Sequence, residues 1–141
     1  MRINPTLIGV FGVIAVFTSL AHAADVKIIA NSSVNASEIS ADDLKKVFLG
    51  TKSSLADGSK VEPVMEKGGP AHTQFLKEYI GKTDDALNTY YRSQVFTGKG
   101  SMPKVLASDA EVAAFVAKTK GAIGYISASA SAPGAKTLEV K

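Results

Sequence analysis

The residues best suited to binding chemistry lie in one short connection, residues 65–73. Two adjacent glycines there leave backbone N–H groups accessible, and Pro70 is well placed for the first turn of a helix. Unpaired N–H groups and the helix dipole at such a position favour an anion. The sequence therefore predicts a weak anion-binding nest formed by Lys67, Gly68, Gly69, His72 and Thr73.

Two residues beside this nest oppose a strong grip on an anion. Glu66 places a carboxylate just before the glycines, where it repels a second negative charge. Pro70 has neither a hydroxyl nor a backbone N–H to donate. The expected site is therefore weak.

Other kinds of chemistry find no support in the residue pattern. His72 is the only histidine after residue 23, and the sequence has no cysteine, so no metal site of nitrogen and sulfur ligands is expected. A lone histidine at a helix start is typical of a surface residue. The tripeptide at 81–83 (Gly-Lys-Thr) lacks the upstream glycine of a phosphate-binding loop, and no serine lies in a nucleophile elbow. We predict no catalytic residue, no metal, no cofactor and no enzymatic activity.

Hydrophobic periodicity predicts the elements that position this connection. Short apolar runs predict strands at 26–30, 61–65, 122–126 and 137–140. Helices are expected after the capping residues Ser40, Thr83 and Ser108, and a further helix begins at Pro70. Residues 96–103 and 127–134 are expected to be loops.

The order of these elements predicts the class of fold. Strands alternate with helices, which is typical of an α/β domain with helices on both faces of a sheet. We expect a three-layer α/β/α domain with a mixed sheet. It would occupy residues 24–141, a length sufficient to bury a core without disulfides.

The first 23 residues have the pattern of a cleavable signal peptide. Arg2 supplies a positive charge, residues 7–20 are largely apolar, and residues 21–23 read Ala-His-Ala, a small-x-small cleavage site. The apolar run is shorter than the roughly 20 residues that span a bilayer, which favours cleavage over an uncleaved anchor. We therefore predict a periplasmic protein without a membrane span after cleavage. Without cysteine it is not a lipoprotein.

Charge gives no indication of a nucleic-acid partner. Residues 24–141 contain 15 basic and 13 acidic side chains, and the basic ones are spread along the chain. A nucleic-acid site requires basic residues clustered on one face. We expect no nucleic acid to bind.

Four stretches, in this order, carry a family resemblance: residues 44–50, 75–81, 96–100 and 121–126. Together they resemble the substrate-binding proteins of phosphate ABC transporters, which have a periplasmic binding protein-like fold of type 2. The resemblance runs from about Val26 to Tyr125 and covers one lobe. It implies a single-lobe short form of that fold.

The resemblance also implies a ligand and partners. Phosphate-binding relatives hold the ligand with an arginine and a Gly-Ser-Gly-Thr run, where this chain has Glu66, Gly69, Pro70, Ala71 and His72. The implied function is capture or sensing of phosphate or another oxyanion with an altered loop, beside an ABC permease. A single lobe leaves the ligand half exposed, so a homodimer or an envelope protein could supply the missing wall. The alternative is a ligand-free interaction module of the cell envelope that retains the fold.

Overall fold

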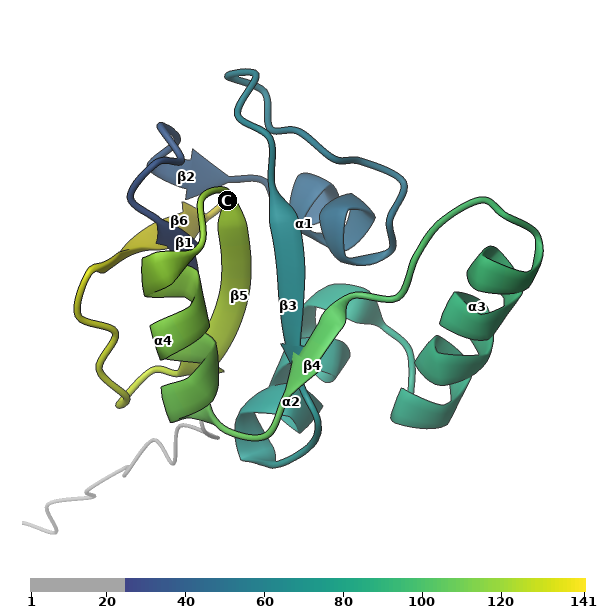
Figure 1. The fold of residues 1–141 in the computed structure, drawn as a ribbon. Coiled ribbons are helices and arrows are strands. Elements are labelled where there is room, and N and C mark those ends of the chain that lie inside the picture. The colour runs from purple at the N-terminus through teal and green to yellow at the C-terminus, as the bar shows by residue number, and fades with distance from the viewer. Residues whose placement is uncertain (1–24) are drawn as a thin grey trace, which may run out of the picture.

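The computed structural model describes residues 25–141, so the predicted signal peptide at 1–23 lies outside the described residues. A six-stranded sheet forms the centre of the fold, in the order β2-β6-β1-β5-β3-β4 (Figure 1). The strands are β1 (Val26–Asn31), β2 (Glu38–Ile39), β3 (Glu62–Glu66), β4 (Lys104–Leu106), β5 (Ala122–Ser127) and β6 (Ala135–Val140).

The sheet is mixed. β1 is antiparallel to both of its neighbours, β5 and β6, whereas β2 is parallel to β6. β3 runs parallel to both β4 and β5. The carboxyl ends of β3, β4 and β5 therefore lie at the same edge of the sheet, and this edge positions the candidate site.

Local sequence signals fix where the helices begin. Ser40, Thr83 and Ser108 each accept a hydrogen bond from a backbone N–H three residues later, as their capping patterns predict. A left-handed glycine, Gly81, ends the π-helix that continues α2. The helices are α1 (Ala41–Phe48), α2 (Pro70–Phe75), η1 (Leu76–Ile80), α3 (Asp84–Phe96) and α4 (Asp109–Lys118).

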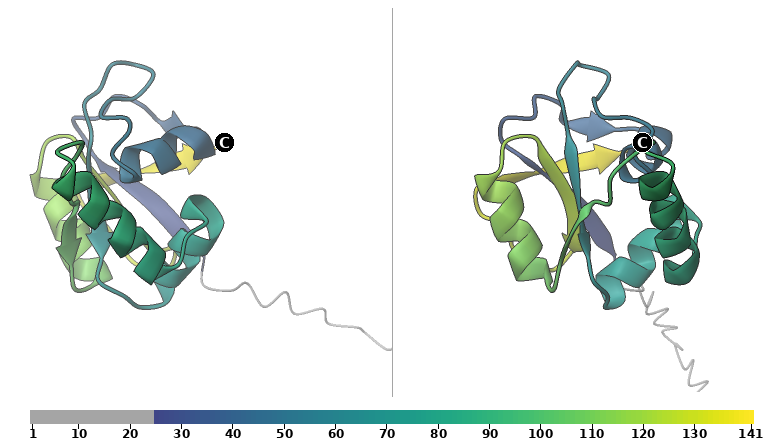
Figure 2. Two further views of the ribbon diagram at one scale, coloured as in Figure 1. Left: turned by 90° about the vertical axis from the view of Figure 1, so that its right-hand side faces the viewer. Right: turned by 45° about the vertical axis from the view of Figure 1, so that its right-hand side comes forward.

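Two apolar cores lie on opposite faces of the sheet. Side chains from α1, α2, η1 and α3 pack on one face, around Tyr125 of β5. Its ring stacks on Phe75 with centroids 3.9 Å apart. α4 covers the other face, as Figures 1 and 2 show. There Val112 and Val116 belong to the same buried cluster as Ile29 of β1. The predicted three-layer α/β/α fold with a mixed sheet is confirmed.

Some elements differ from the sequence-based expectation. β2 and β4 were not predicted, because strands of two and three residues give almost no periodic signal. α3 extends to Phe96, which had been placed in a loop. Among residues 25–141, no helix combines the length and the apolar character that crossing a membrane requires.

Candidate functional site

The candidate site lies where the starts of α2 and α4 meet the carboxyl ends of β3 and β5. We call it the α2–α4 mouth. In α/β sheets, ligands gather outside the carboxyl ends of the strands, beside the helix starts. A pocket of about 210 Å³ opens there, lined by Glu66, Gly68, Gly69, Pro70, Ala71, Ala107, Ser108, Asp109 and Ser127.

The glycines give the mouth accessible backbone amides. Gly69 precedes α2 with φ at 97°, a conformation that favours glycine, and no side chain caps the helix start. A Cβ atom added at Gly68 or Gly69 would meet no atom within 4 Å. In the described part of the chain the Gly68 and Gly69 N–H groups donate no hydrogen bond, so they are free to hold a ligand.

Glu66 forms the floor of the mouth. It is only 4% exposed, and its Oε1 atom has no hydrogen-bond partner among residues 25–141. Its backbone N–H donates to the Tyr125 hydroxyl at 3.0 Å, which fixes the end of β3 against β5. The pKa of Glu66 is raised from 4.5 to about 8. Burial is the largest cause, followed by the hydrogen bond to Asp109 and the charge of Asp109. At neutral pH this side chain is therefore an uncharged carboxylic acid.

Asp109 supplies the negative charge of the mouth. It follows the α4 cap Ser108, and its Oδ1 atom accepts the Ser127 N–H at 3.2 Å. Burial alone would raise the pKa of Asp109, but hydrogen bonds from Glu66 and Ser127 outweigh it and lower the pKa. The mouth thus combines a carboxyl donor with a carboxylate acceptor. No group of three or more His, Cys, Asp or Glu side chains suited to a metal occurs within residues 25–141.

Sequence reasoning missed half of this site. Ser108 and Asp109 were interpreted as helix-capping residues alone, and Ser127 as part of a loop. The pattern that could have pointed to them is the capping box that begins at Ser108. It follows a strand directly, as the glycine pair at 68–69 does. Because that strand, β4, is three residues long, it has almost no periodic pattern from which it could be predicted.

The five predicted nest residues do not share one pocket. Gly68 and Gly69 line the α2–α4 mouth. Lys67 lines a different pocket, between β3 and α3. The Thr73 hydroxyl donates to the Gly69 carbonyl at 3.1 Å, and Thr73 lines a further pocket together with Gly68 and His72.

His72 is buried, so its expected place on the surface is wrong. It is 5% exposed and lies between two partners. The Tyr125 hydroxyl, which already accepts the Glu66 N–H, donates to Nδ1, and Nε2 then donates to the Asp84 carboxylate at 3.0 Å. His72 ties α2 to β5 and to the start of α3, and it lines no part of the mouth.

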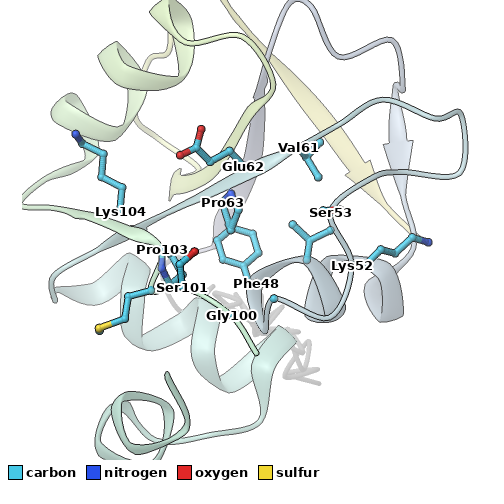
Figure 3. Close-up of a pocket in the computed structure, with 13 residues that line it drawn as sticks. Phe48, Lys52, Ser53, Val61, Glu62, Pro63, Gly100, Ser101, Pro103 and Lys104 are labelled. Carbon is cyan, nitrogen blue, oxygen red and sulfur yellow. The ribbon is translucent and has the colours of Figure 1, made fainter. Parts of the chain in front are cut away.

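Another pocket, of about 270 Å³, lies at the opposite end of β3, beside Pro63 (Figure 3). Its basic residues are already engaged. Lys52 pairs with Asp43 at 2.8 Å, and the Lys104 ammonium lies 4.9 Å from the centre of the Phe115 ring. The rest of the lining is largely apolar or glycine and serine, so this pocket does not concentrate charge as the mouth does.

Comparison with known proteins finds similarity at the level of fold. No family model matches, and no curated protein matches. An ABC-type phosphate transport receptor from Vibrio cholerae is similar in structure, with a TM-score of 0.63 and 15% identity over 82% of this chain. A putative phosphate ABC transporter substrate-binding protein from Clostridium perfringens, with bound phosphate, is similar with a TM-score of 0.63 and 14% identity over 82% of this chain. PstS from Borrelia burgdorferi is similar with a TM-score of 0.62 and 15% identity over 82% of this chain.

The similarity covers part of each of these proteins. This chain matches 45%, 44% and 47% of their respective lengths. The resemblance expected from the four sequence stretches is therefore confirmed as a shared periplasmic binding protein-like fold. The solved structures most similar to this chain include substrate-binding proteins, and at 14–15% identity they define the fold alone.

Proposed function

We propose that this chain is a periplasmic solute-binding domain that holds a small, protonated oxyanion of the phosphate type in the α2–α4 mouth. It would act in ABC-type uptake or in sensing beside a transporter. The observation that carries the proposal is the convergence of the free amides of Gly68 and Gly69 with the carboxyl pair of Glu66 and Asp109 at one sheet edge. The similar structures include a phosphate transport receptor and a putative substrate-binding protein with bound phosphate, which supports the same class of ligand.

The chemistry of the mouth restricts the kind of oxyanion. The Gly68 and Gly69 amides donate hydrogen bonds to oxygen atoms of the ligand, whereas the single carboxyl proton of Glu66 is donated to Asp109. The Asp109 carboxylate only accepts, so it requires a ligand that carries a proton. Phosphate keeps a proton at neutral pH, whereas sulfate has none and would meet Asp109 as an unrelieved like charge. We therefore expect phosphate to bind better than sulfate.

Affinity is expected to be weak and to depend on pH. An open pocket leaves much of the ligand in water, which is consistent with a Kd on the order of 1 mM. As the pH rises through about 8, Glu66 loses its proton and becomes a second negative charge. Phosphate binding should therefore weaken above that pH.

Calorimetry on the purified protein tests the proposal. Phosphate and sulfate are titrated at about pH 6.5 and about pH 9, and heat is expected for phosphate at the lower pH. Asp109→Asn supplies a donor where the carboxylate was, so it should reduce the preference for phosphate over sulfate. Asp42→Asn, at the exposed start of α1, is the matched control. Absence of heat with millimolar phosphate at the lower pH would remove the oxyanion proposal.

A further inference from the structure

An exposed apolar face lies between the end of α3 and the edge of the sheet. Phe96, the last residue of α3, is 92% exposed. Val95, Met102 and Val105 are 50%, 46% and 48% exposed. We call these four residues, with the loop 97–101 and strand β4, the α3–β4 face. Grouped exposed apolar side chains of this kind mark interaction surfaces.

β4 also offers a free backbone edge at this face. It is the last strand of the sheet and pairs only with β3 among the described residues. The Leu106 carbonyl accepts the Lys67 N–H at 2.8 Å, so Leu106 points its backbone groups toward β3. Because these groups alternate in direction along a strand, the N–H and C=O of Val105 point outward. They are available to an added strand.

α3 leaves room beside that edge. Of its residues, Leu87 and Tyr91 are buried, and the Tyr91 hydroxyl bonds the Phe48 carbonyl at the end of α1. A pocket of about 280 Å³ lies between α3 and β4, with Met102 and Val105 in its lining. Val105 pairs with Met65 of β3, so both side chains lie on the same side of the sheet. This is the side on which the pocket lies. An apolar side chain of a partner strand would fill it.

The charge of the face indicates the chemistry of the partner. From Ala86 to Ser108 the sequence contains Arg92, Lys99 and Lys104 and no acidic residue. The Lys104 ammonium packs on the Phe115 ring, whereas Arg92 and Lys99 form no ion pair among residues 25–141. Glu62 of β3 shares a pocket with Lys104 (Figure 3) and offsets part of this charge. The α3–β4 pocket has two acidic residues in its lining: Asp84, which is already bonded to His72, and the buried Glu66. A second copy of the chain would place these cations against one another, which opposes self-pairing at this face.

We propose that the α3–β4 face binds an extended acidic segment of a partner protein, which adds as a strand to β4. Main-chain hydrogen bonds at Val105 would fix its register, apolar side chains would pack on Phe96 and Met102, and carboxylates would meet the surrounding cations. Because β4 is short, side-chain contacts must contribute much of the affinity. Strand addition at β4 does not require that the α2–α4 mouth hold an anion.

The proposal is tested with the purified full-sequence protein and two short synthetic peptides. One alternates glutamate with valine, and the other alternates lysine with valine. In amide NMR spectra, the acidic peptide should shift the signals of Val105 and of residues 95–106, and added salt should weaken its binding. The basic peptide should leave these signals in place.

Two variants separate strand addition from simple charge attraction. Val105→Pro removes the outward N–H while leaving the bonds to β3, and should weaken the acidic peptide about tenfold. Val105→Thr keeps the N–H and the branched side chain and should bind like the parent. Three results would each overturn the proposal. They are unchanged signals at 95–106 with millimolar acidic peptide, equal binding of the basic peptide, or a dimer in sedimentation that Val105→Pro dissociates.

Discussion

Replacement of Glu66 by glutamine is the sharpest test of the chemistry at the α2–α4 mouth. Folding raises the pKa of Glu66 from 4.5 to about 8, so the folded state keeps a proton that the unfolded chain releases. Between those pH values the folded protein binds more protons than the unfolded chain, and its stability must fall as the pH rises. Glutamine has nearly the shape of the protonated acid and cannot lose a proton.

The magnitude follows from the two pKa values. At about 1.4 kcal/mol per pH unit, the interval from 4.5 to about 8 sets a ceiling of about 5 kcal/mol on the stability that the parent loses. Water entry and rotation of Asp109 will relieve part of the cost of a buried charge. We therefore expect Glu66→Gln to gain about 2–3 kcal/mol over the parent between about pH 5 and pH 8, and the difference to level off above that.

Urea denaturation of both proteins across this pH interval measures the effect. Glu62→Gln, at the exposed start of the same strand, is the matched control and should follow the parent curve. Because the lowered pKa of Asp109 acts at lower pH, it does not contribute to this interval. Parallel curves for the parent and Glu66→Gln between about pH 5 and pH 8 would refute a buried, protonated Glu66.

Three further predictions concern the residues that hold the mouth in place. Tyr125→Phe removes the hydroxyl that hydrogen-bonds the Glu66 N–H and His72 Nδ1, so each buried group loses its partner and the free energy of unfolding should fall by about 1–3 kcal/mol for each. Tyr79→Phe, on a partly exposed ring, is the control and should change the free energy of unfolding little. Gly124→Ala places a Cβ atom 2.9 Å from a buried valine of α4 and should cost about 1–3 kcal/mol in urea denaturation. Gly68→Ala meets no atom within 4 Å and is its control, so equal losses would contradict the packing explanation. Ser108→Ala removes the α4 cap and should cost about 1 kcal/mol, read from the denaturation midpoint.

Features that depend on neighbours in the sequence could be predicted. The capping hydroxyls of Ser40, Thr83 and Ser108 act within three residues, and each makes the bond that its pattern indicates. The buried strands β1 and β5 are rich in β-branched and apolar residues, which marks them without tertiary information. These local signals were sufficient for the α/β class and the mixed sheet.

Features that depend on strand pairing could not be predicted. Asp109 reaches Glu66 because β4 pairs in parallel with β3, and β4 has three residues of which two are exposed. His72 is buried because Tyr125 and Asp84, which are 53 and 12 residues away in the sequence, close around its ring. The hydrophobic pattern around His72 does not predict contact with either residue.

The α2–α4 mouth and the α3–β4 face are joined by a very short segment. β4 ends at Leu106, Ser108 caps α4, and the N–H of Ala107 between them donates to the Glu111 carboxylate at 2.8 Å. A strand added beside Val105 therefore acts on the segment that positions Asp109. If the two sites are coupled, bound acidic peptide must change phosphate affinity by the same factor by which phosphate changes peptide affinity. Equal phosphate affinity in the presence and in the absence of saturating acidic peptide would refute coupling through β4.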